Sequence, residues 1–221
     1  MFRITEKKHH VFDCDGVLFD SNALKVEALK DTFQMIGSPV EFINLAAEEF
    51  RLNFGRTRRD HFDAFLGHET VDGYRMDPLC VDSALEYYGK QVQVLYSSCP
   101  IVKETLNYIS LQVSSEYSFV VSASSQAELR NILPYRIPYF SEDRIFGGPI
   151  KKVENLQEIA AEVGAENMVF YGDSVQDAMA AIEVGVTFVG LAKYAVDPQT
   201  LKHFCINKGL KCFDSCLEII S

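Results

Sequence analysis

Hydrophobic and polar positions divide the chain into two kinds of stretch. Over residues 22–95, apolar residues recur at spacings of three and four, as in Val26, Leu29 and Phe33, which predicts helices. No alternating pattern typical of a strand interrupts them. After residue 95, short apolar runs such as 119–121 alternate with helical patterns. The two stretches therefore predict two different architectures.

The predicted elements follow from these periods and from their capping signals. In chain order they are a strand over 9–13, helices within 22–95, a helix over 100–109, a strand over 117–122, a helix over 125–133, a strand over 144–146, a helix over 153–163, a strand over 168–171, a helix over 174–184 and a strand over 187–190. Short strands that alternate with helices indicate an α/β fold with a Rossmann-like parallel sheet, covered on both faces. Because the helical stretch interrupts the first crossover, we expect a core domain, 1–21 and 96–221, with an inserted helical cap domain, 22–95.

Composition and charge narrow the class of protein. The chain has 221 residues, 48% of them apolar, and a formal net charge of −10, which argues against nucleic acid or an anionic membrane surface as the main partner. No apolar run reaches ~18 residues, and the first eight residues lack the apolar core of a signal peptide. The six cysteines form no CxxC pair, so we expect no zinc site and reduced thiols in a cytoplasmic protein.

The most informative motif follows the first predicted strand. Asp13 and Asp15 lie two positions apart at its end, and Gly16 comes next. Two carboxylates of like charge in a dry site need a compensating cation, and oxygen-only ligands favour Mg²⁺. The alternative is an ordinary acidic turn at the end of a strand.

Polar residues follow three further predicted strands. They are Ser122 with Ala123, the pair Lys151 and Lys152, and Asp173 with Ser174 and Asp177. The carboxyl ends of parallel strands meet in one crevice, so we expect these groups to converge on the first motif. Two of them also have a structural reading, since Ser122 suits an N-cap and Ser174-x-x-Asp177 is a capping-box spacing.

Together the four motifs resemble the haloacid dehalogenase-like (HAD) superfamily, in the branch that contains phosphoglycolate phosphatases and β-phosphoglucomutase. The segment from Asp13 to Ser21 is similar to the family's opening motif almost residue for residue. The resemblance implies that Asp13 is the nucleophile and that Asp15 is the general acid and base. It also implies a Mg²⁺ site formed by Asp13, Asp15 and Asp173, with Asp15 contributing its backbone carbonyl.

The resemblance assigns the remaining motif residues to the phosphoryl group and to the surroundings of the metal. Ser122, Ala123 and Gly16 would bind phosphate. Either lysine suits the family position, and Lys152 fits it better than Lys151 because Val153-Glu154 follows. Around the metal, the resemblance gives Asp177 and Ser174 an outer role.

One signal lies in the expected cap domain. Gly55-Arg56-Thr57-Arg58 resembles the cap loop that enters the active site in β-phosphoglucomutase-like members. Gly55 and Arg58 would then be substrate residues of the cap, and Arg58 would meet a distal anionic group of the substrate. The alternative is a surface arginine in the basic run 56–59.

These observations predict a magnesium-dependent phosphatase that hydrolyses a small phosphomonoester, such as a sugar phosphate or a phosphoglycolate-like acid, through an aspartyl-phosphate. The expected partner is a small phosphorylated metabolite, with no nucleic acid and no membrane, and the protein is expected to be a monomer or a dimer. Two alternatives stay open at this point, a phosphomutase of the β-phosphoglucomutase type and a non-catalytic HAD-like binding domain.

Overall fold

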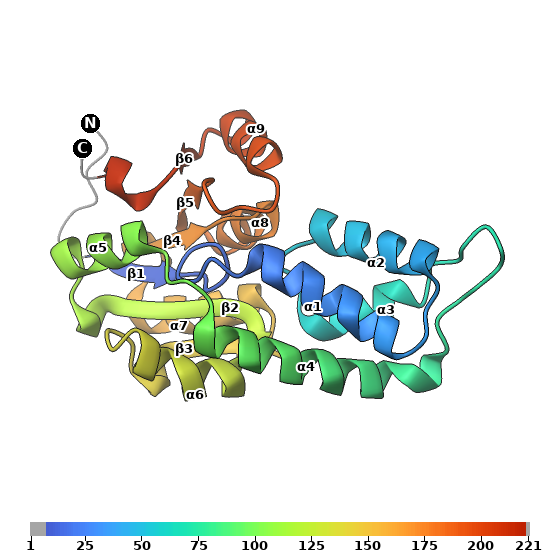
Figure 1. Cartoon of the computed structure of the whole chain (residues 1–221). Coiled ribbons are helices and arrows are strands. Elements are labelled where there is room, and N and C mark those ends of the chain that lie inside the picture. The colour runs from blue at the N-terminus through green and yellow to red at the C-terminus, as the bar shows by residue number, and fades with distance from the viewer. Residues whose placement is uncertain (1–7, 220–221) are drawn as a thin grey trace.

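The structure is a computed structural model that describes residues 8–219 and contains one six-stranded sheet (Figure 1). Every pair of neighbouring strands is parallel, and the strand order is β3-β2-β1-β4-β5-β6. The strands are β1 (His9–Phe12), β2 (Ser118–Ser125), β3 (Ile145–Gly148), β4 (Met168–Gly172), β5 (Thr187–Leu191) and β6 (Lys211–Phe213). The α/β fold class and the parallel sheet expected from the sequence are confirmed.

Helices cover the sheet and extend beyond its carboxyl end. Four helices lie beyond that end, where the strand arrows point in Figure 1: α1 (Asn22–Met35), α2 (Val40–Leu52), α3 (Arg58–Phe65) and α4 (Val81–Ser98). Five others lie along the sheet: α5 (Lys103–Gln112), α6 (Gln126–Arg136), α7 (Lys152–Val163), α8 (Val175–Val184) and α9 (Pro198–Lys208). Segment 22–95 contains no strand, as its pattern predicts.

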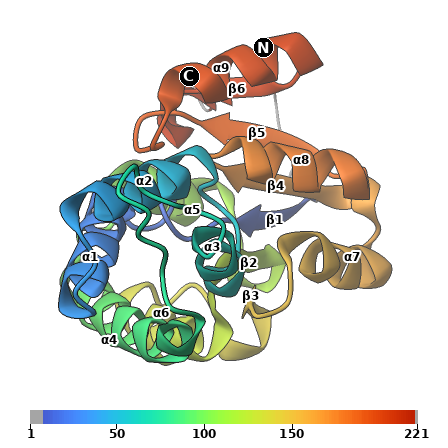
Figure 2. The same cartoon turned by 90° about the vertical axis from the view of Figure 1, so that its right-hand side faces the viewer.

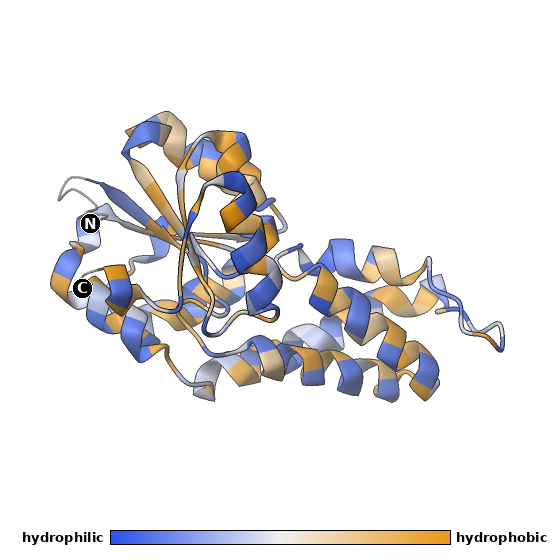
Figure 3. Ribbon diagram, turned by 90° about the horizontal axis from the view of Figure 1, so that it is seen from above, coloured by the Kyte–Doolittle hydropathy of each residue, from blue (hydrophilic) through white to orange (hydrophobic). Residues whose placement is uncertain are grey.

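Alternate residues of the strands pack on opposite faces of the sheet. Val11 and Phe170 face the layer that holds α7, α8 and α9, whereas Phe12 and Tyr171 face the layer of α5 and α6 (Figure 2). The Phe12 and Tyr171 rings stack with centroids 4.7 Å apart. Burial on both faces explains the continuous apolar runs of the strands, which Figure 3 shows at the centre of the molecule.

Two neighbouring stretches of chain connect the four-helix segment to the sheet. Phe19 pairs with Ile101 in an antiparallel bridge, and the Asp20 amide donates to the Pro100 carbonyl at 2.9 Å. The prediction of a helix from Pro100 is wrong at its start, because these pairings hold residues 100–102 extended and α5 begins at Lys103. The chain therefore leaves the sheet layer and returns to it at one place.

Two further differences from the expected elements concern the sheet. The second strand continues to Ser125, past the predicted end at Ser122, and its pairing with β3 is irregular between Val121 and Ser125. The short strand β6 and the helix before it were not predicted. The strand has only one exposed and two half-buried residues, which give no clear period.

Two expectations concern membranes and targeting. In the part of the chain that the structure describes, no helix combines the length and the apolar character needed to cross a bilayer. Residues 1–7, on which the expectation of no signal peptide rests, lie outside the described residues.

Candidate active site

Three carboxylates and one lysine meet at the carboxyl end of β1 and β4. Asp13, Asp173 and Asp177 are buried, and each offers an oxygen within 4.8 Å of an oxygen of the other two. The Lys152 ammonium lies 3.0 Å from Asp13 Oδ1 and forms a second ion pair with Asp177. Residues far apart in the sequence therefore converge as expected from the ends of parallel strands.

The charges of this carboxylate cluster are unbalanced. Burial raises the pKa of Asp13 to about 7, although the Lys152 ammonium opposes the shift. Burial, with Asp13 and Asp177 nearby, raises the pKa of Asp173 well above its usual range. One ammonium among three buried carboxylates leaves an excess of negative charge, which a divalent cation would offset.

The cluster also offers ligand atoms that suit a hard cation. Asp173 Oδ1 is buried and receives no hydrogen bond within the described residues, while its Oδ2 accepts one from Asn22 Nδ2 at 2.6 Å. Carboxylate oxygens are the ligands that Mg²⁺ prefers. The residues present therefore fit a magnesium ion.

Gly16 makes room for this arrangement. Its φ of +73° lies in the left-handed region, and a Cβ placed there would lie 2.0 Å from Asp173 Oδ2. Any side chain at this position would push the carboxylate away. Gly16 is thus required because its backbone packs closely against Asp173, in the loop that follows β4.

Ser174 and Asp177 form the capping box that their spacing predicts. Ser174 Oγ accepts from the Asp177 amide at 3.2 Å, and Asp177 Oδ2 accepts from the Ser174 amide at 3.1 Å. The other carboxylate oxygen of Asp177 accepts from Lys152. Asp177 therefore both stabilises the first turn of α8 and holds Lys152 beside Asp13.

Asp15 faces a different set of partners. Its oxygens accept hydrogen bonds from Ser21 Oγ at 2.6 Å and Tyr96 Oη at 2.8 Å, and the Lys25 ammonium lies 2.6 Å away. Burial raises the pKa of Asp15, but the ammonium and the two hydroxyl donors outweigh burial and hold it below its ordinary value. Asp15 is therefore a carboxylate in this arrangement.

The expected phosphate seat lies within β2 and not at its end. Ser122 is fully buried, and its Oγ accepts from the Ser124 amide at 3.2 Å. The alternative reading of Ser122 as an N-cap is wrong, because the irregular pairing lets the strand continue past it. Ser125 is the N-cap of α6, as the predicted helix over 125–133 requires. Ser122, Ala123 and Ser124 line the cavity beside Asp13.

The structure separates the two neighbouring lysines. Lys152 is 7% exposed and paired within the cluster, whereas Lys151 is exposed and immediately precedes α7. Lys152 is therefore the lysine whose charge reaches Asp13.

The loop before α3 reaches the carboxylate cluster. Gly55 has a φ of +101°, and a Cβ there would lie 2.9 Å from Ser174 Oγ. Arg58 lines the same cavity, but its two terminal nitrogens donate to Glu128 on α6 at 2.9 and 2.8 Å. The charge of Arg58 is thus already paired with Glu128. The sequence predicted neither this pair nor this position, since it offered a substrate contact or a surface arginine.

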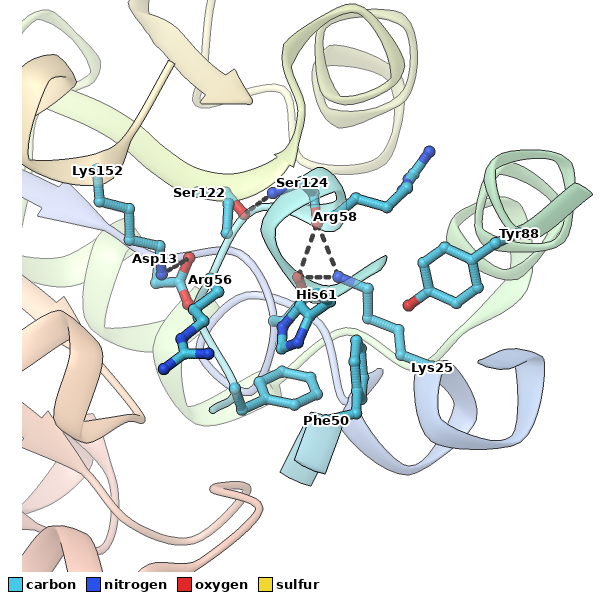
Figure 4. A pocket seen from close by; sticks show the side chains of 14 residues that line it. Asp13, Lys25, Phe50, Arg56, Arg58, His61, Tyr88, Ser122, Ser124 and Lys152 are labelled. Carbon is cyan, nitrogen blue, oxygen red and sulfur yellow. Dashed lines mark hydrogen bonds and ion pairs between the residues drawn. The ribbon is translucent and has the colours of Figure 1, made fainter. Parts of the chain in front are cut away.

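A narrow cavity of about 30 Å³ lies between the carboxylate cluster and helices α1–α4 (Figure 4). That volume holds only a few water molecules. Its walls combine the acidic end with aromatic side chains from α2, α3, α4 and the loop before α3: Phe50, His61, Tyr88 and Phe54. The helices therefore close over the reactive groups.

A family model described as haloacid dehalogenase-like hydrolase matches residues 10–191. The chain belongs to the haloacid dehalogenase-like hydrolase family. This membership makes it an enzyme of the hydrolase type and confirms the resemblance of the motifs. No protein of curated function is significantly similar to the chain in sequence.

Solved HAD-like structures share the fold over nearly the whole chain. A hydrolase from Pseudomonas syringae is 15% identical, with 96% of each chain covered and a TM-score of 0.73. A HAD hydrolase from Entamoeba histolytica is 15% identical, covers 96% of this chain and 95% of its own, and gives 0.72. CbbY from Rhodobacter sphaeroides, solved with phosphate, is 19% identical, with 96% of each chain covered and 0.71. At these identities the likeness concerns the fold alone.

Sequence reasoning missed the partners of the motif carboxylates. Lys25, Tyr96 and Asn22 contact Asp15 or Asp173 and lie on α1 or α4. The sequence held one signal for Lys25. It lies between Asn22 and Leu29 on a stripe of helical spacing, and all three residues are buried. A lysine in such a stripe, directly after a motif with two carboxylates, indicates a buried ion pair.

Proposed function

We propose that the chain is a magnesium-dependent phosphatase that hydrolyses a small phosphomonoester through an aspartyl-phosphate on Asp13. The observation that carries the proposal is the contact of Asp13 with Lys152, beside two further buried carboxylates and at the edge of a narrow cavity. The lysine lies where it would offset the charge of an arriving phosphoryl group.

In the first step, an Asp13 oxygen attacks phosphorus, and the bond from phosphorus to the leaving oxygen breaks. That oxygen takes a proton, which we assign to Asp15. Because Lys25 holds Asp15 as a carboxylate, this acid role requires a protonated Asp15 released from the pair. In the second step, water attacks phosphorus and gives its proton to Asp15, and inorganic phosphate leaves Asp13. The ionised Asp15 in the structure is in the protonation state that this second, water-activating step needs.

The carboxylates of Asp13 and Asp173, with the backbone carbonyl of Asp15, would hold Mg²⁺, and Asp177 would support it through Lys152 and Ser174. When bound, the ion neutralises charge on the transferred phosphoryl group. Phosphate contacts would come from Ser122, Ala123 and the Gly16 turn.

We further propose that residues 22–95 act as a cap domain over the core, 1–21 and 96–221. The cavity of about 30 Å³ is too small for any phosphomonoester, so binding requires the cap to open. Charge pairing favours hydrolysis over the phosphomutase alternative. Arg58 is engaged by Glu128, so the cap presents no free guanidinium there for the second phosphate of a bisphosphate.

The test is phosphate release from a panel of phosphorylated metabolites and p-nitrophenyl phosphate. We expect turnover with Mg²⁺, loss of activity in a chelator and little support by Ca²⁺, whose coordination is larger and looser. Asp13→Asn should abolish turnover, whereas Asp31→Asn, an exposed carboxylate on α1, should leave it unchanged. Full activity in the chelator would exclude the metal, and a sugar phosphate isomer with little free phosphate would establish the mutase.

A further inference from the structure

Two buried polar groups on the cap wall of the cavity lack hydrogen-bond partners. His61 on α3 and Tyr88 on α4 are each 2% exposed, and neither His61 Nδ1 nor the Tyr88 hydroxyl has a partner within the described residues. Both side chains line the cavity that contains Asp13 (Figure 4). Buried polar groups are nearly always paired, so two unpaired ones on one cavity wall indicate groups that a ligand satisfies.

The two groups offer neutral hydrogen bonding. Burial, with Arg56 and Lys25 nearby, lowers the pKa of His61 to about 3, so its ring is uncharged. Burial raises the pKa of Tyr88 to about 12. A neutral imidazole nitrogen and a phenol accept or donate as their partner requires, and a hydroxyl is the ligand group that can do both.

The cations around this wall already have partners. Lys25 is paired with Asp15, and Arg58 with Glu128. Arg56, whose side chain is 39% exposed, lies 3.5 Å from Glu49. A carboxylate or a second phosphate buried here would meet no unpaired cation among these three side chains and would have to break an existing pair.

Aromatic faces complete the wall. The Phe50 ring lies 4.4 Å from the His61 ring and 5.2 Å from the Phe54 ring, measured between centroids. The Arg58 guanidinium stacks on the Tyr88 ring at 5.2 Å, which holds that ring in place. Apolar walls with few fixed polar groups are typical of sites that orient a small neutral ligand.

We propose that His61 and Tyr88, set against Phe50 and Phe54, form a subsite for an uncharged, hydroxyl-bearing leaving group. The substrates are then monophosphates of neutral sugars or polyols, and phosphorylated carboxylic acids and bisphosphates are excluded. This inference rests on the proposed phosphatase function.

The test compares kcat/KM of the full chain with Mg²⁺ on four kinds of ester, one of them a bisphosphate, fructose 1,6-bisphosphate. Glucose 6-phosphate and glycerol 3-phosphate carry neutral hydroxyls, 2-phosphoglycolate carries a carboxylate, and p-nitrophenyl phosphate reports the phosphoryl chemistry alone. We expect at least one neutral ester to exceed 2-phosphoglycolate by about tenfold or more. A preference for 2-phosphoglycolate, or for fructose 1,6-bisphosphate, would overturn the subsite.

The variant Tyr88→Phe removes only the hydroxyl. It should lower kcat/KM for the best neutral ester by about three- to tenfold, as expected for one neutral hydrogen bond, and leave p-nitrophenyl phosphate within twofold. Because the hydroxyl has no protein partner, Tm should stay equal or rise. Tyr87→Phe, the half-buried neighbour on α4, is the matched control and should change neither quantity. An equal loss on all esters would mean that Tyr88 has only a structural role.

Deoxy analogues and binding make the test independent of turnover. One monodeoxy analogue of the best sugar phosphate should react equally with the wild type and with Tyr88→Phe. The missing sugar hydroxyl and the missing Tyr88 hydroxyl remove the same contact, so losing the second costs nothing more. Calorimetric binding of the esters to Asp13→Asn with Mg²⁺ should give the same ranking and the same loss in the double variant with Tyr88→Phe. If no ester releases phosphate but the binding affinities keep this ranking, the phosphatase is refuted and the subsite is supported. Binding without any preference for neutral esters would refute the subsite.

Discussion

The buried ion pair between Lys25 and Asp15 gives the sharpest prediction about stability. Lys25→Met keeps most of the length of the side chain and removes the ammonium, which lies 2.6 Å from Asp15 and 2.7 Å from Ser124 Oγ. The side chains of Lys25 and Asp15 are only 9% and 6% exposed. The substitution therefore leaves a carboxylate buried without its cation.

The magnitude follows from the geometry. At 2.6 Å and an effective dielectric constant near 20, the attraction is about 6 kcal/mol before desolvation is counted. Breaking one side of a buried pair typically costs ~3–5 kcal/mol. Ser21 and Tyr96 still donate to Asp15, so we expect the free energy of unfolding to fall by about 3 kcal/mol, the lower end of that range.

Urea unfolding at pH 7 measures this loss. The matched control is Lys30→Met on the same helix, whose exposed pair with Glu27 should contribute less than ~1 kcal/mol. The double variant Lys25→Met/Asp15→Asn should be more stable than Lys25→Met alone, because it removes the unpaired charge. The reasoning is refuted if Lys25→Met costs no more than Lys30→Met, or if the double variant is the less stable one.

Three further predictions follow from other parts of the site. Gly16→Ala puts a methyl group into the carboxylate cluster and should weaken Mg²⁺ binding, measured by calorimetry, by about tenfold or more; unchanged affinity would contradict the packing argument. A double-mutant cycle of Arg58→Lys and Glu128→Gln should give a coupling energy of about 1–2 kcal/mol, and additive losses would mean that the bidentate pair does not hold α3 to α6. Burial lowers the pKa of His10 to about 4 and that of His61 to about 3. Below pH 6.5 these histidines are therefore protonated in the unfolded chain but stay neutral in the folded chain. Stability should fall from pH 6.5 towards 4 by up to ~1.4 kcal/mol per pH unit for each histidine, and His10→Asn should flatten this dependence in a Tm series; an unchanged slope would refute the assignment.

The sequence predicts which polar residues converge at the carboxyl end of the sheet, for a physical reason. Asp13, Asp173 and Lys152 each follow a strand, and strands with continuous apolar runs must lie side by side in one parallel sheet. Their carboxyl ends then meet whatever the details of packing. Lys152, the first residue of α7, is the lysine that lies beside Asp13, whereas Lys151 is exposed just before the helix.

The side of the site formed by helices α1–α4 could not be predicted in the same way. Contacts such as Tyr96 with Asp15, or Arg58 with Glu128, join positions 81 and 70 residues apart and depend on how helices pack. Helical periodicity indicates which face of a helix is buried, but not what it packs against. The end of β2 was missed for a local reason, because its irregular pairing after Val121 leaves no mark in the hydrophobic pattern.

The measurement that tests the central claim most directly is the location of a phosphoryl mimic. Beryllofluoride added with Mg²⁺ imitates a phosphoryl group bound to a carboxylate, and ¹⁹F NMR with a crystal structure of the complex identifies the carboxylate that carries it. We predict an adduct on Asp13 that contacts Lys152, is lost in Asp13→Asn and is retained in Asp15→Asn. An adduct on any other aspartate, or one that survives Asp13→Asn, would contradict the account.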